Sequence, residues 1–155
     1  MAASHEVEIT ELAGLIRPGE PQAALTERIA QSTAPGEIRA GLAHLNGDWD
    51  LAHRISQALD SAEGAHWHAL VHRHEPDFPN SKYWLRRAGD SAIYPALREA
   101  AQAAGQVVQV APGGVWDPYL FTDCFADPAM RDWTRPLDAL EAELLLRQER
   151  ARFGL

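Results

Sequence analysis

Residues 64–90 read GAHWHALVHRHEPDFPNSKYWLRRAGD, and this stretch decides the fold class. Apolar residues recur at helical spacing on both sides of Pro76 and Pro79, and a helix interior does not tolerate prolines. Gly89 follows the second apolar segment, in the position where glycine commonly ends a helix. The stretch therefore predicts two helices joined by a short turn, which is an antiparallel helical hairpin.

The residues before this stretch repeat its pattern. Residues 36–59 also contain two segments with helical apolar spacing, and an offset of 29 residues places Asp48 on Asp77. The same offset places Ala52 on Ser81, so a small residue occupies the same position in both hairpins. Small residues let neighbouring helices approach closely, and stacked helix pairs bury a continuous face. The sequence therefore predicts two hairpins that pack side by side.

Helical patterns also account for most of the remaining chain. Six further segments are expected to be helical, namely 7–16, 21–32, 91–106, 117–126, 127–133 and 135–153. The last of these is amphipathic and is expected to close the fold, whereas residues 107–116 are expected to form a loop. The sequence contains no convincing strand alternation and no linker. We expect an all-α fold with one domain over residues 1–155.

The chain is acidic, with 22 acidic and 14 basic residues and a formal net charge of −8. This charge disfavours nucleic acid and anionic lipid as partners. Cys124 is the only cysteine, so no intramolecular disulfide is expected, and the acidic start does not resemble a signal peptide. No apolar run reaches the roughly 18 residues that suggest a membrane span. These features predict a soluble cytoplasmic protein.

Part of the hairpin resembles known helical repeats. The segment SKYWLRRAG, residues 81–89, is similar to the second helix of Sel1-like and tetratricopeptide repeats. This resemblance implies helix pairs that stack around a groove for a peptide or a partner protein. Residues 36–120, which include GDWDLAHRISQ and VWDPY, also resemble a family of small uncharacterised proteins from bacteria and fungi. The second resemblance implies family membership and no particular activity.

Three side chains of the first helix in the hairpin align on one face. His72 and Glu75 follow His68 by four and seven positions, so all three lie within about 60 degrees around a helix. Two imidazoles and a carboxylate suit a divalent metal such as Zn, Fe or Mn, and His53 or Asp50 could complete the set. The chain has no HExxH motif and no EF-hand loop, so this spacing permits a metal without requiring one.

A structural role is the competing interpretation of these residues. Histidines on a partly buried helix often donate to a carboxylate or a backbone carbonyl, and several acids lie nearby in the sequence. Trp49, Trp67 and Trp84 are expected in the hydrophobic core, as tryptophans at helical spacing usually are. The sequence alone leaves both interpretations of the histidines open.

Positive charge concentrates in the same stretch, although the chain as a whole is acidic. We expect a surface patch of basic side chains with aromatic and amide neighbours, suited to a small carboxylate or phosphate. Its members are Arg73, Lys82, Arg86 and Arg87, with Asn80, Tyr83 and Trp84 beside them.

Two functions of different kinds follow. The one we favour is a pocket for a small anionic ligand or a divalent metal, in which His68, His72 and Glu75 are the candidates for acid and base catalysis. The other is a helical-repeat module that binds a protein or peptide and has no catalytic activity. The sequence leaves open the identity of the ligand, the presence of enzymatic activity and the oligomeric state.

Overall fold

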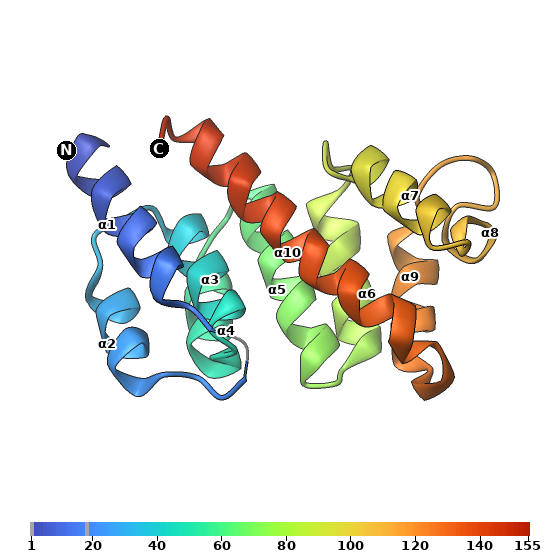
Figure 1. Cartoon of the computed structure of the whole chain (residues 1–155), viewed down its shortest axis with the longest axis horizontal. Coiled ribbons are helices and arrows are strands. Elements are labelled where there is room, and N and C mark those ends of the chain that lie inside the picture. The colour runs from blue at the N-terminus through green and yellow to red at the C-terminus, as the bar shows by residue number, and fades with distance from the viewer. Residues whose placement is uncertain (1, 18) are drawn as a thin grey trace.

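The computed structural model describes residues 2–17 and 19–155, and helices account for most of them (Figure 1). In chain order these are α1 (Ala2–Leu15), α2 (Ala23–Gln31), α3 (Gly36–Leu45), α4 (Trp49–Ser56), α5 (Ala62–His74), α6 (Phe78–Ala88), α7 (Tyr94–Ala103), α8 (Val107–Val110), α9 (Pro118–Ala126), the 3-10 turn η1 (Pro128–Met130) and α10 (Arg131–Arg152). No strand occurs within the two described ranges, which confirms the predicted all-α class. None of the helices there is both long enough and apolar enough to cross a bilayer.

Helices α3 to α6 form the two predicted hairpins, and the second helix of each hairpin begins in the same way. The Asp48 side chain accepts a hydrogen bond from the Leu51 N–H at the start of α4. Asp77 accepts one from the Asn80 N–H at the start of α6. An aspartate at this position satisfies an N–H group that a helix leaves unpaired in its first turn.

Small residues let the helices of each hairpin approach one another. Ala52 of α4 and Ser81 of α6 are both buried, at the positions that the sequence offset matches. The Ser81 hydroxyl donates to the Ala69 carbonyl of α5 at 2.8 Å, which fixes α6 against α5. Because α4 also packs against α5, the hairpins lie side by side as predicted (Figure 1).

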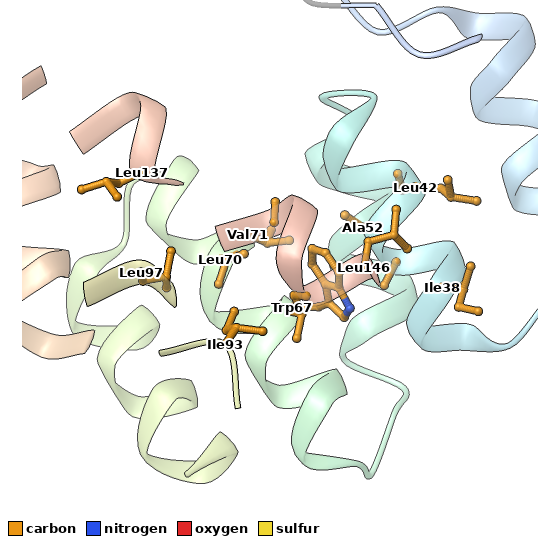
Figure 2. Close-up of a cluster of buried hydrophobic side chains, with 14 of the residues drawn as sticks. Ile38, Leu42, Ala52, Trp67, Leu70, Val71, Ile93, Leu97, Leu137 and Leu146 are labelled. Carbon is orange, nitrogen blue, oxygen red and sulfur yellow. The ribbon is translucent and has the colours of Figure 1, made fainter. Parts of the chain in front are cut away.

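The long helix α10 crosses the hairpins and closes the core. It contacts α3, α5, α7 and α9, and Figure 1 shows it running across the molecule between them. Trp67 of α5 is fully buried in the apolar cluster, with Ile38 and Leu42 on one side and Ile93 and Leu97 on the other (Figure 2). The C-terminal helix α10 therefore closes the core, as the sequence predicted.

Trp67 packs directly against the backbone of α3. A Cβ atom at Gly41 would lie 2.7 Å from the Trp67 ring, closer than two nonbonded carbons approach. Glycine inside a helix normally destabilises it relative to alanine. At Gly41 that cost is offset because the missing side chain admits the indole ring.

Two of the predicted boundaries are wrong. Residues 107–116 were expected to form a loop, yet Val107–Val110 forms the short helix α8. Residues 127–133 do not form a separate helix, because α10 begins at Arg131 and continues through Pro136. Proline favours a first turn, which is why the sequence predicted a new helix at this point. Pro136 instead occupies the second turn of α10, on an exposed side.

Two of the three tryptophans expected in the core lie at its edge. Trp67 is buried as predicted, whereas Trp49 and Trp84 are only half-buried. Each of the latter two stacks on a histidine ring, Trp49 on His74 with centroids 4.2 Å apart and Trp84 on His68 with centroids 4.0 Å apart. Trp84 therefore covers the buried His68, and Trp49 covers the partly buried His74.

Candidate functional site

Three histidines from the two hairpins meet where α4 packs on α5. One nitrogen of each of His53, His68 and His72 lies within 4.8 Å of the others. The ring centroid of His53 lies 4.7 Å from that of His68 and 5.0 Å from that of His72. Sequence spacing had aligned His68 and His72 on one helical face, and the structure brings His53 to that face from the neighbouring hairpin.

Glu75 contacts two of these rings from the end of α5. Its Oε2 lies 2.7 Å from Nδ1 of His72, and its Oε1 lies 3.2 Å from Nδ1 of His53. A carboxylate accepts hydrogen bonds, so the His72 Nδ1 carries the proton and its Nε2 keeps a lone pair. Asn80 agrees with this tautomer, because its Nδ2 lies 3.2 Å from Nε2 of His72 and can donate to it.

His68 differs from the other two because it has no polar partner. The residue is 4% exposed, and neither ring nitrogen finds a hydrogen-bond partner in the described part of the chain. Burial, together with the neighbouring His72 and His53, lowers the pKa of His68 to about 4. The ring is therefore neutral at physiological pH, with one nitrogen able to accept or to coordinate.

The site is closed on one side and open on the other. His68 and His72 are buried, whereas the side chains of His53 and Glu75 are each 33% exposed. Trp84 covers His68, and the Arg87 guanidinium lies 5.4 Å from the centroid of the Trp84 ring. Solvent therefore contacts His53 and Glu75, whereas His68 and His72 lie behind them in the protein interior.

The predicted basic patch is not assembled as expected. Lys82 pairs with Asp123 of α9, so its charge joins two helices. Arg86, Arg87 and Tyr83 are exposed on α6. Asp50 lines a separate hollow with Trp49 and Pro21. Of the residues predicted to bind a ligand, Asn80 and Trp84 contact the histidine cluster directly.

Arg73 does not belong to that surface patch, and this prediction is wrong. The residue is 0% exposed and its Nη1 lies 2.8 Å from Asp138 and 2.6 Å from Glu141, both on α10. Helical periodicity explains the difference, because Arg73 follows His72 by about 100 degrees and so faces α10 and away from His53.

Histidines extend this buried network on both sides. His66 pairs with Glu141 at 2.9 Å, and His74 pairs with Asp138 at 2.7 Å. Burial alone would raise the pKa of both carboxyls, but Arg73 and the histidines hold them well below their ordinary values. Both acids are therefore ionised inside the protein. Sequence reasoning overlooked Glu141, although it interrupts the leucine stripe of the C-terminal segment at the buried spacing.

His44 adjoins the same network and makes stability depend on pH. Burial, followed by the effect of His74, lowers the pKa of His44 to about 3. An unfolded histidine titrates near about pH 6.5, so between these values the unfolded chain binds a proton that the folded chain does not. This contribution to stability is complete above about pH 6.5 and is lost as the pH falls toward about 3.

We expect the urea midpoint of the metal-free protein to fall as the pH is lowered from about 7 to about 4. His44→Gln should reduce that slope, because one proton fewer is taken up on unfolding. His5→Gln, on α1 outside the network, should leave the slope unchanged. Parallel stability curves for His44→Gln and the unmodified chain would show that His44 does not contribute to the pH dependence.

Comparisons of the chain with protein-family models, with curated proteins and with solved structures found no match.

Proposed function

We propose that this protein binds a divalent transition metal ion, with zinc as the first candidate, through His53, His68 and His72. The observation that carries the proposal is the unpartnered ring of His68, buried beside two other imidazoles. Buried polar groups are nearly always hydrogen-bonded, so a buried imidazole whose two nitrogens both lack a hydrogen-bond partner needs an explanation. A metal ion supplies a partner for one of these two nitrogens.

The arrangement of the three nitrogens supports this ligand set. Zinc lies about 2.0–2.1 Å from histidine nitrogen, which puts tetrahedral ligands about 3.3 Å apart. The chosen nitrogens of the three histidines lie up to 4.8 Å apart. Small side-chain rotations would shorten these distances to about 3.3 Å. Asn80 would give up its contact with His72 Nε2, at the modest cost of one hydrogen bond.

Glu75 has a positioning role in this proposal. Metal-binding histidines almost always donate their other ring N–H to a carboxylate or carbonyl, which fixes the ring and raises its basicity. Glu75 is placed to do so for both His72 and His53. The sequence prediction had made Glu75 a ligand, whereas its contacts with the Nδ1 atoms favour a place just outside the coordination sphere.

The open side of the cluster suggests what the fourth ligand is. Three protein ligands with a water in the fourth position are typical of catalytic zinc sites, whereas structural sites use four protein ligands. The side chain of His53 is 33% exposed, so water can contact the cluster at this residue. We therefore favour a site that can activate water over a purely structural one, and we name no substrate.

Metal titration of tag-free protein tests the proposal. We expect one equivalent of Zn²⁺ to bind, and Co²⁺ in its place to give the visible bands of a tetrahedral nitrogen site. His68→Ala should weaken binding by at least about 100-fold, because it removes a ligand, and Glu75→Gln should weaken it by about 10-fold to 100-fold. Elemental analysis of the purified protein identifies the metal it carries from the cell.

His5→Ala is the matched control, since His5 lies on α1 and contacts Thr33. It should leave affinity and stoichiometry unchanged. If the unmodified protein binds no zinc, or if His68→Ala binds it equally well, the proposal is wrong. A stability loss in His68→Ala without any metal-binding defect would instead support a purely structural role for the histidines.

The two hairpins also support a finer assignment of architecture. We propose that α3–α4 and α5–α6 are degenerate helical repeats of the Sel1-like and tetratricopeptide type. Support comes from the shared aspartate caps Asp48 and Asp77 and from the buried small residues Ala52 and Ser81. In such proteins the stacked pairs commonly present a groove to a peptide, and that interaction role remains the alternative to metal binding.

A further inference from the structure

A second cavity lies on the other side of α5, between α5, α6, α9 and the start of α10. Its volume is about 230 Å³. The lining includes three arginines, one histidine and two phenylalanines, namely Arg73, Arg131, Arg135, His74, Phe78 and Phe125. No carboxylate occurs among the described residues that line it, although the chain carries a formal net charge of −8. Asp138 and Glu141 compensate the charge of Arg73 behind the wall, so among the described lining residues Arg131 and Arg135 supply the positive charge that no ion pair offsets.

Arg73 forms part of the buried wall of this cavity and has unused hydrogen-bond donors. Both of its ion pairs, to Asp138 and to Glu141, use the single atom Nη1. Its Nε and Nη2 are buried and find no partner in the described part of the chain. The ring centroids of Phe121 and Phe125 lie 4.9 and 5.7 Å from the guanidinium carbon of Arg73. An aromatic ring attracts the cation, but it offers the Nε and Nη2 protons no oxygen or nitrogen acceptor.

The other two arginines lie at the start of the longest helix. Arg131 and Arg135 occupy the first two turns of α10, both are exposed, and neither forms an ion pair within the described residues. The N-terminus of a helix carries partial positive charge from its aligned peptide dipoles, which favours anions. The helix terminus and both arginines therefore lie at the cavity that Arg73 also lines, with the Arg135 guanidinium 4.2 Å from the centroid of the Phe125 ring.

We propose that this cavity binds a small oxyanion with an apolar or aromatic group, either a carboxylate or a phosphate monoester. The oxyanion pairs with Arg131 and Arg135, since forked guanidinium groups match carboxylate and phosphate oxygens, and the unused N–H groups of Arg73 lie in the buried wall behind them. Phe78 and Phe125 supply the wall for the apolar part. The volume suits a small molecule and excludes a folded polymer.

This site is separate from the histidine cluster. The helix α5 presents His72 toward α4, whereas the next two residues, Arg73 and His74, face α10 and the cavity. Anion binding therefore needs no metal, and the two proposals fail or succeed independently.

Calorimetric titration with phenyl phosphate and with benzoate, in the presence of a chelator, tests the inference. We expect one site per chain for at least one of these probes and no binding of benzyl alcohol, which lacks the charge. Replacing Arg73 would disturb the core, so the test uses the exposed arginines. Arg131→Gln and Arg135→Gln should each weaken binding by about tenfold, the effect of one lost charge-assisted hydrogen bond.

Arg147→Gln is the matched control, because it removes the same charge from an exposed position farther along α10. It should change the affinity less than twofold. Equal losses in Arg147→Gln and Arg135→Gln would show a general charge effect and overturn the proposed site. So would the absence of binding of both probes at millimolar concentration, or unchanged affinity in both cavity variants.

Discussion

Replacing Arg73 by methionine is expected to lower the free energy of unfolding by about 3–5 kcal/mol. The side chain is 0% exposed and contacts both Asp138 and Glu141, which α10 buries against α5. Arg73 helps to hold the pKa of each carboxyl below its ordinary value, so both acids are charged in the folded state. Methionine fills the space but leaves two buried carboxylates without their arginine, each with a single histidine partner.

Urea denaturation at neutral pH measures this loss. Arg147→Met is the control, since Arg147 is exposed on α10, and its stability should change by no more than about 0.5 kcal/mol. Adding Asp138→Leu and Glu141→Leu to Arg73→Met should recover part of the loss, because an apolar set replaces a buried charged one. A loss below about 1 kcal/mol in Arg73→Met would mean that the carboxylates take up protons at little cost.

Most of the helical framework was predictable from local sequence. The hairpins follow from apolar spacing, from the proline breaks and from the aspartates that cap α4 and α6, all of which act within a few residues. The boundary near Pro136 was not predictable in this way. Proline marks a helix start by local rules, yet α10 continues through it, and its apolar side packs onto four other helices.

The positions of the three histidines in the candidate site were predictable from the sequence, but their hydrogen bonding was not. Spacing alone placed His68 and His72 on one face, and the hairpin repeat brought His53 toward them. Neither signal showed that His68 lacks a partner, because burial and hydrogen bonding depend on every neighbouring element.

The buried ion network could not be predicted from local spacing. The partners of Arg73 lie 65 and 68 residues away in the sequence, on a helix whose register against α5 is set by packing. Clustered positive charge near Arg73 suggested a surface patch, since most arginines are exposed. Arg73 is buried because it lies on the face of α5 that packs against α10. Asp138 and Glu141 on α10 offset the cost of burying its charge.

Truncation of Trp67 to alanine is expected to cost about 3–5 kcal/mol, as deletions of large core side chains do. The ring is 0% exposed and fills the space against Gly41 of α3 and near Leu146 of α10, so its loss leaves a void where three helices meet. Trp49→Ala should cost clearly less, because Trp49 is half-buried and mainly loses its stacking on His74. Denaturant unfolding of both variants under the same conditions gives the comparison.

Trp67→Phe should keep most of the stability, since the indole N–H has no partner within the described residues to lose. Equal losses for Trp67→Ala and Trp49→Ala would contradict the assignment of Trp67 as the centre of the core and Trp49 as its edge.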